Sequence, residues 1–498
     1  MRTAGVLMPV ASLPSDYGIG CFSKEAYGFI DNVKESGLSL WQILPLGPTG
    51  FGDSPYSSFS TFAGNPYFID PDQLVKKGWL KKKDTERYDF GKDPGHVDYG
   101  KIYDARFKML RKAFKNSGIE NDRRFKAFVK KNSFWLKDYA LYMSIKTHKK
   151  GAPWLQWEKD LRIRKKDAVR KAAEKYAGDI LFYEFLQFEF EEEWKKLKSY
   201  ANKKGVKIVG DVPIYVAMDS ADTWAGAELF QLDKDMKPKA VAGCPPDYFS
   251  PTGQLWGNPL YDWDHHKKTG YSWWIKRFKR MFEFYDVVRI DHFRGFDSYY
   301  SIPYGSSTAV NGHWVKGPGY SLFDTMKKEL GEREVIAEDL GILTDSVRRL
   351  VKRTGYPGMK ILEFAFDPGA DSDYLPHNHI KNSVVYTGTH DNDTCLGWYR
   401  TAGRKGRRFI DRYLDIGDIP EKEIPWVFIR NAMRSVADIC IIPMQDFLSL
   451  GSEARINIPS TLGNNWSWRM KKNAFTKRIC RRIKEMVTLY RRGSGTED

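Results

Sequence analysis

The chain has 498 residues, 42% hydrophobic and 15% aromatic, so it can bury a large core. Its net charge of +17 could serve a nucleic-acid partner, but the basic residues fall in helical segments among acids, and no zinc-finger, phosphate-loop or RNA-recognition motif accompanies them. We therefore interpret the charge as solvated helix faces and expect no nucleic-acid partner.

Neither the cysteines nor the apolar segments indicate export or a membrane. The five cysteines are widely scattered without a CxxC pair, which argues against a disulfide framework or a zinc site. The opening MRTAGVLMPV lacks the features of a signal peptide, and no run approaches the ~18 apolar residues of a membrane span. We expect a cytoplasmic monomer or homodimer with no membrane association.

The chain begins with the pattern of a parallel α/β unit. Gly5–Val10 is predicted as a buried strand, Ser23 caps a helix that runs to about Ser36, and Leu38–Leu44 is a second strand. The loop that follows, PLGPTGFGDSPYSSFSTFAGNPY, is too rich in Gly, Pro and Ser for a helix. Loops of this length in compact proteins tend to be functional.

Two insertions are predicted next. Residues 72–204 carry the charged, amphipathic pattern of helices and form a helical insertion after the second strand. Val206–Gly210 is a third strand, and residues 219–266, rich in Trp, Tyr, Pro and Gly, form a loop-rich insertion after it that overhangs the site. A helix over Ser272–Phe284 then leads into the strand of DVVRIDHFRG, residues 286–295.

The remaining chain alternates strands and helices. The last four predicted strands are Glu334–Ala337, Met359–Phe366, Ser383–Thr387 and Asp438–Pro443. The predicted helices of this part are Ser321–Leu330, Thr344–Thr354, Pro425–Val436 and Ala474–Arg491. Eight β-then-α units indicate one (β/α)8 TIM barrel, of class α/β, that spans residues 1–498 and carries the insertions between its strands.

Polar side chains end several of these strands, at the edge where TIM barrels carry their sites. They are Asp211, Arg289, Asp291, His292, Glu338, Asp339, Asp367, His390 and Asp391. Such a set suits either a divalent-metal site or glycoside chemistry. Aromatic loop residues favour glycan, because sugars present apolar C–H faces to aromatic rings while their hydroxyls need polar partners. With no metal-binding loop evident, we expect no metal and no cofactor.

The motifs RIDHFRG, AEDLG and TGTHDNDT resemble the signatures of the 4-α-glucanotransferase family, the amylomaltases or disproportionating enzymes of the amylase superfamily. Further blocks, PLGPTGFGDSPYSSFSTFAGNPY, PPDYFSPTGQLWGNPLYDW and GNNWSWR, extend the resemblance over almost the whole chain. It implies transfer of α-1,4-glucan segments from a donor glucan to the 4-hydroxyl of glucose or a maltooligosaccharide, with retention through a covalent glucosyl-enzyme. The alternative is an amylase-type hydrolase, in which water is the acceptor.

The resemblance also implies roles for individual residues. Asp291 would be the nucleophile, Glu338 the acid/base, and Asp391 the group that holds the 2- and 3-hydroxyls of the sugar. The implied substrate-binding residues are Tyr56, Asp247, Gln254, Trp256, Arg289, His292, Asp367, His390 and Asn464. Arg289, two residues before Asp291 on one strand, is expected to keep that carboxylate ionised, and Asp211 to support Arg289.

Overall fold

The computed structural model describes residues 2–50, 52–246, 250–341 and 343–493. Its centre is a parallel sheet in the strand order β10-β11-β12-β1-β2-β3-β6-β9. The strands are β1 (Thr3–Leu7), β2 (Leu40–Gln42), β3 (Lys207–Val212), β6 (Val287–Ile290), β9 (Val335–Ala337), β10 (Gly358–Ile361), β11 (Ser383–Tyr386) and β12 (Ile439–Pro443). The Ala337 N–H at the end of β9 donates to the Pro357 carbonyl just before β10 (3.0 Å), which brings the sheet round into a barrel. The predicted TIM barrel is confirmed.

The register of β3, β6 and β9 brings their polar residues to one end of the barrel. All four residues of β6 are buried, as expected for a parallel strand covered on both faces. Asp211 pairs with Arg289 across β3 and β6, and Ile290 pairs with Ala337 across β6 and β9. Asp291 and Glu338 therefore follow directly after paired residues of neighbouring strands.

The predicted helices around the barrel are present, with ends within a few residues of the expected ones. They are α1 (Lys24–Glu35), α12 (Ser272–Phe284), α13 (Tyr320–Leu330), α14 (Asp345–Thr354), α17 (Ile424–Arg434) and α19 (Lys477–Leu489). Three more helices, α15 (Cys395–Thr401), α16 (Arg404–Leu414) and α18 (Met444–Phe447), follow the last two strands. The strand predicted to reach Phe366 ends at Ile361, because Leu362–Phe364 turn into a 3-10 helix.

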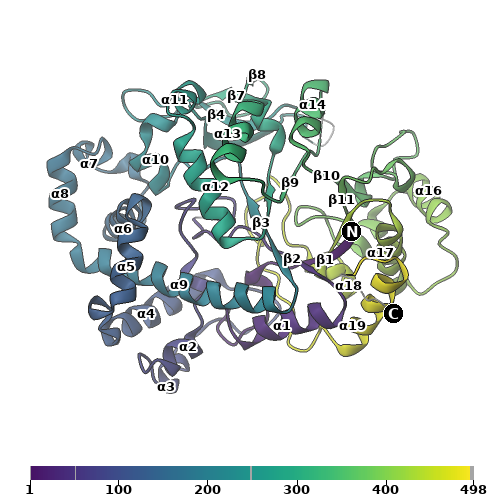
Figure 1. The fold of residues 1–498 in the computed structure, drawn as a ribbon, viewed down its shortest axis with the longest axis horizontal. Helices are drawn as coiled ribbons and strands as arrows, with labels where there is room; N and C mark the ends of the chain where they lie inside the picture. The colour runs from purple at the N-terminus through teal and green to yellow at the C-terminus, as the bar shows by residue number, and fades with distance from the viewer. Residues whose placement is uncertain (1, 51, 247–249, 342, 494–498) are drawn as a thin grey trace.

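A large group of helices lies between β2 and β3. It comprises α2 (Pro71–Lys76), α3 (Lys82–Thr85), α4 (Tyr99–Ser117), α5 (Arg123–Lys131), α6 (Ser133–His148), α7 (Lys159–Arg162), α8 (Lys166–Lys175) and α9 (Ala177–Lys203). Figure 1 shows these helices gathered on one side of the barrel, on the left, with α16, α17 and α19 on the other side. Helix α9 returns to the barrel, where the Trp194 indole donates to the Phe284 carbonyl at the end of α12 (3.1 Å).

A second, antiparallel sheet lies beside the barrel, with the strand order β5-β4-β7-β8. Its strands are β4 (Ala240–Cys244), β5 (Gln254–Pro259), β7 (Ser298–Pro303) and β8 (His313–Lys316), and the short helices α10 (Ala221–Ala225) and α11 (Trp263–Lys268) flank the first two. The sequence predicts only loops here, because QLWGNP carries Gly and Pro, and the pairing of β4 with β7 is formed by residues about sixty positions apart. The division of the chain into a barrel with two insertions stays a prediction.

Within the part of the chain that the structure describes, none of the helices combines the length and the apolar character that crossing a membrane requires.

Candidate active site

Arg289 joins two carboxylates at the end of β6. Its Nη1 donates to both carboxylate oxygens of Asp211 at 2.7 Å and to Oδ1 of Asp291 at 3.0 Å. Arg289 and Asp211 are buried, whereas the Asp291 side chain keeps 28% of its surface exposed. Asp211 Oδ2 also accepts a hydrogen bond from the hydroxyl of Tyr56 (2.7 Å), which lies in the loop after β2. The predicted contacts of Arg289 with Asp211 and Asp291 are confirmed.

Glu338 is held next to Asp291 by backbone hydrogen bonds. The His292 N–H donates to Glu338 Oε2 (2.6 Å), and the Leu340 N–H donates to Oε1 (2.8 Å). Each carboxyl oxygen therefore has a fixed donor, and one of these donors belongs to the residue that directly follows Asp291. The barrel thus fixes the Asp291 and Glu338 side chains relative to one another.

The electrostatics of Asp291 differ from the sequence-based expectation. Burial raises the pKa of Asp291 well above that of an ordinary aspartate; Arg289 opposes this shift, while the charges of Asp211, Glu338 and Asp391 add to it. Arg289 thus lowers the pKa of Asp291, the direction expected from the sequence, but burial outweighs it and Arg289 is shared with Asp211. Burial also raises the pKa of Glu338. Because the two carboxyls interact, their protons leave in two steps that belong to the pair.

Asp391 approaches from the far side of the barrel mouth, in the turn after β11. Its Oδ1 accepts a hydrogen bond from the Asn457 amide (2.6 Å) and lies 3.5 Å from His390 Nε2. Arg455 Nη2 donates to the Asp391 carbonyl (2.8 Å). Neither Asn457 nor Arg455 is predicted from the sequence, because a polar residue in a loop carries no signal of its own; only its contact with Asp391 distinguishes it.

Three rings form one wall of the mouth. The Tyr56 and His390 rings are stacked, with centroids 5.1 Å apart and planes 15° apart. The centroid of the Trp466 ring lies 5.8 Å from that of Tyr56 and 5.9 Å from that of His390. Asn464 is the residue predicted from the GNNWSWR block, but it is exposed and its carbonyl accepts a bond from the Ser467 hydroxyl (3.2 Å). Trp466 of the same block is the residue that reaches the mouth.

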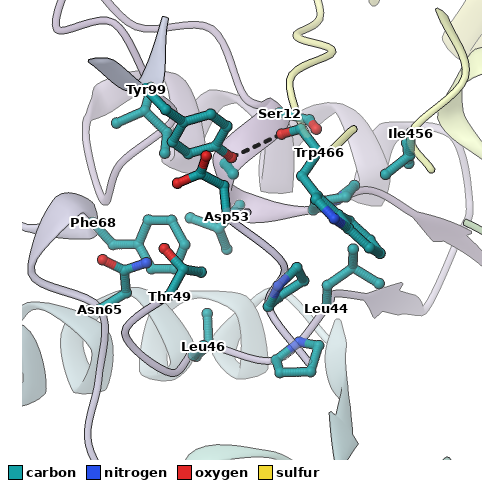
Figure 2. A pocket seen from close by; sticks show the side chains of 16 residues that line it. Ser12, Leu44, Leu46, Thr49, Asp53, Asn65, Phe68, Tyr99, Ile456 and Trp466 are labelled. Atoms are coloured by element: carbon teal, nitrogen blue, oxygen red, sulfur yellow. Dashed lines mark hydrogen bonds between the residues drawn. The ribbon is translucent and has the colours of Figure 1, made fainter. Parts of the chain in front are cut away.

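A small cavity lies behind Trp466, and its lining residues fix the position of Trp466 (Figure 2). The Tyr99 hydroxyl donates to the Trp466 carbonyl (2.8 Å), as the dashed line shows. Asp53 lies beside Tyr99 and Phe68 among mostly apolar lining residues, and burial raises the pKa of its carboxyl to about 6. Residues of the loop after β2 and of helix α4 therefore line the same cavity as Trp466.

The antiparallel sheet contributes Trp256 to the mouth. The Trp256 ring on β5 meets the His292 ring edge-on, with centroids 4.8 Å apart, and its indole N–H donates to Gln254 Oε1 (3.1 Å). His292 has a left-handed backbone (φ 51°), and burial lowers its pKa to about 3. Its Nε2 is buried and has no hydrogen-bond partner among the described residues. Asp247, expected in the same segment, lies outside the described residues.

Asp367 lies on an exposed loop. Its Oδ1 accepts a hydrogen bond from the Gly369 N–H (3.1 Å), and it forms no hydrogen bond with the other predicted site residues that the structure describes. The same loop reaches the mouth at Tyr374. Burial, together with the charges of Asp339 and Glu338, raises the pKa of Tyr374 to about 12.

The fold and the site together define a class of protein. A parallel barrel whose strand ends bring Asp, Glu and Asp to one aromatic-lined mouth is typical of carbohydrate-active enzymes of the (β/α)8 type. Residues 8–475 match the family model described as 4-alpha-glucanotransferase. The 4-alpha-glucanotransferase of Clostridium butyricum is 48% identical over 487 residues, which are 97% of this chain and 100% of that protein.

Other relatives agree. The 4-alpha-glucanotransferase of Thermus thermophilus is 47% identical over 94% of this chain and 95% of its own length. The structure of the amylomaltase from Streptococcus agalactiae in complex with acarbose superposes with a TM-score of 0.96 at 41% identity, covering 99% of this chain and 100% of that one. The chain belongs to the 4-α-glucanotransferase family, and glycosyl transfer is its enzymatic activity. The transferase function expected from the motifs is confirmed.

Proposed function

We propose that this mouth transfers α-1,4-glucan segments by a retaining double displacement, with Asp291 as nucleophile and Glu338 as acid/base. The observation that carries the proposal is the placement of both groups directly after paired residues of β6 and β9, with the His292 N–H on the Glu338 carboxyl. Neighbouring strands lie about 4.8 Å apart. That spacing suits the ~5–5.5 Å carboxyl separation of retaining enzymes better than the ~6.5–9.5 Å of inverting ones.

The proposed reaction needs one proton on the carboxyl pair. The Asp291 carboxylate attacks the anomeric carbon, and the glycosidic C–O bond breaks as Glu338 gives its proton to the leaving oxygen. The leaving chain departs with a free 4-hydroxyl. The incoming 4-hydroxyl then gives its proton to Glu338 and attacks the anomeric carbon, which releases Asp291. Asp391, fixed by Asn457, holds the sugar's 2- and 3-hydroxyls in both transition states.

The remaining site residues are proposed to bind the glucan chain. His292 offers a buried ring nitrogen that has no protein partner among the described residues, and a sugar hydroxyl can supply that partner. The rings of Tyr56 and Trp466 present apolar faces for C–H groups. The amylomaltase from Streptococcus agalactiae is in complex with acarbose, which supports maltooligosaccharides as ligands of this mouth. Gln254, Asp367, Asn464 and Asp247 are proposed as further contacts. Cytoplasmic location and a monomeric or homodimeric state stay predictions.

Incubation with maltotriose tests the proposal, with the Asp291→Asn variant as control. The wild-type protein should produce free glucose together with a ladder of longer chains. The new linkages should have the α configuration by NMR, and Asp291→Asn should be inactive. Shortened products with a steady rise in reducing ends would instead identify water as the main acceptor, and β linkages would contradict retention.

A further inference from the structure

Glu363 is a buried carboxyl whose purpose the proposed mechanism does not explain. It follows β10, in the 3-10 turn Leu362–Phe364, and only 6% of its surface is exposed. Neither carboxyl oxygen has a hydrogen-bond partner among the described residues. The Asn392 amide lies close enough to lower the pKa of Glu363, but not within hydrogen-bonding geometry. An unpartnered buried carboxyl is costly enough to require an explanation.

The Glu363 carboxyl lies directly beneath the turn that carries Asp391, residues 387–393. The Glu363 N–H donates to the Thr387 carbonyl (3.1 Å) at the start of this turn. A Cβ placed on Gly388 would lie 2.7 Å from Glu363 Oε1, so the turn rests on the carboxyl without space for a side chain. On the far side of Asp391, Asn392 Oδ1 closes the turn by accepting the N–H (2.9 Å) and hydroxyl (2.8 Å) of Thr389.

The surroundings of Glu363 are acidic. Asp446 on α18, just after β12, accepts hydrogen bonds from the Thr387 hydroxyl (2.5 Å) and the Cys395 N–H (2.8 Å), and Asp393 accepts one from the Ser452 hydroxyl (2.7 Å). The positive charge of Arg455 lowers the pKa of Glu363. Burial raises the pKa of Glu363 well above the usual range, and the charges of Asp446 and Asp393 raise it further. Within the described residues, no three His, Cys, Asp or Glu side chains are arranged to hold a metal ion.

We propose that Glu363 is a positioning residue for glucan transfer: an uncharged, polar brace beneath residues 387–393 that keeps Asp391 in place. A charged Glu363 would add a third carboxylate beside Asp393 and Asp446 and push against the turn. An apolar side chain would remove the polar group that faces Gly388 and Asn392. The inference rests on the proposed role of Asp391.

Two variants separate charge from polarity. Glu363→Gln is uncharged and polar, so it should keep kcat for maltotriose disproportionation within about twofold of wild type. Glu363→Leu is uncharged but apolar, and should lower kcat about tenfold or more with little change in KM, because Asp391 acts in the transition state. A fully active Glu363→Leu, or a Glu363→Gln as impaired as Glu363→Leu, would overturn the proposal. Asp391→Asn tests the underlying assignment separately: if that variant is active, the role of Asp391 fails whatever Glu363 does.

The uncharged state has its own test, which holds even if Glu363→Leu does not fold. A group whose pKa is raised by folding contributes stability at low pH and loses it as the pH rises towards its folded pKa. Glu363→Gln should therefore gain free energy of unfolding over wild type progressively above about pH 4.3, the ordinary pKa of glutamate. Glu184→Gln on α9, where burial raises the pKa to about 7, is the matched control. Glu184→Gln should show a similar gain in free energy of unfolding with an unchanged kcat. If the difference in free energy of unfolding between Glu363→Gln and wild type does not depend on pH, Glu363 is charged and the proposal fails.

Discussion

Arg289 shows how one buried side chain serves two neighbours at once. Its Nη1 is closer to Asp211, at 2.7 Å, than to Asp291, at 3.0 Å. The buried pair with Asp211 compensates the cation, since an unpaired guanidinium inside the barrel would be costly. Arg289 therefore lowers the pKa of Asp291 less than burial raises it, and the charges of three nearby carboxylates raise it further. The proton balance of the mouth therefore depends on Asp211, a residue that is not expected to touch the sugar.

The Asp211→Asn variant should move the acidic limb of kcat/KM to lower pH. The Asp211 charge raises the pKa of Asp291, and Arg289 lowers it. Without that charge, Arg289 interacts with Asp291 alone. The pKa of Asp291 should then fall by on the order of one unit, so that the carboxylate stays ionised down to a lower pH. The pH profile of kcat/KM for maltotriose measures the shift, because it reports the groups of the free enzyme.

Asp339→Asn is the matched control for this shift. Asp339 accepts a hydrogen bond from the Met359 N–H (2.7 Å), and its charge raises the pKa of Glu338. Its removal should therefore move the alkaline limb to lower pH and leave the acidic limb in place. An acidic limb that is unchanged or higher in Asp211→Asn would contradict the proposed sharing of Arg289.

The antiparallel sheet is the element that the site depends on outside the barrel. It carries Trp256 to His292, and its pairing of β4 with β5 needs a glycine at position 243. A Cβ on Gly243 would lie 2.1 Å from the Gln254 carbonyl oxygen, which is backbone and cannot move without separating the strands. A change at Gly243 should therefore reach the mouth through Gln254 and Trp256.

We expect Gly243→Ala to destabilise the protein by about 1–3 kcal/mol, as for other overpacked sites, and to raise KM for maltotriose. Thermal unfolding and steady-state kinetics measure the two effects. Gly178→Ala, near the start of α9, is the control: nothing lies within 4 Å of a Cβ there, and alanine in a helix is favoured by roughly 0.5–1 kcal/mol. A normal KM in Gly243→Ala would show that Trp256 is placed independently of β4.

At the scale of the whole molecule, a buried ion pair links the helices between β2 and β3 to the barrel. Arg280 Nη1 on α12 lies 2.7 Å from Glu191 Oε2 on α9, and both side chains are buried. Arg280 Nε also donates to the Phe62 carbonyl (3.2 Å) in the loop that carries Tyr56. Lys195 lies 2.6 Å from the other Glu191 oxygen. The pair therefore joins α9, α12 and the loop of the active site.

Arg280→Met should cost about 3 kcal/mol of unfolding free energy, since among the described residues it leaves the buried Glu191 with Lys195 as its one remaining ion-pair partner. Adding Glu191→Met should recover much of that loss, because the double variant removes both charges. Denaturant unfolding of the two single variants and the double variant measures the coupling. Additive losses would show that the two residues stabilise the protein independently.

The barrel was predictable because its strands are short and rich in apolar, β-branched residues, such as Val287, Val288 and Ile290, and because its carboxylates directly follow them. The antiparallel sheet was not, since β4 pairs with β7, which follows the next barrel strand. The site shows the same limit. Asp291 and Glu338 could be found from their motifs, whereas Asn457 and Trp466 reach the mouth only through long-range folding. The contacts of Arg289 with Asp211 and Asp291 were expected from the strand ends, whereas the burial that raises the pKa of Asp291 was not.

We propose that Asp291 forms a covalent bond with the transferred glucan, and trapping of that intermediate tests its role most directly. A fluorinated α-glucosyl fluoride, which slows release of the intermediate, should label the intact enzyme, and mass spectrometry of its peptides should place one fluoroglucosyl group on Asp291. Asp291→Asn should remain unlabelled. A label on another carboxylate, or turnover of the reagent to a β-configured product without any adduct, would contradict Asp291 as the nucleophile.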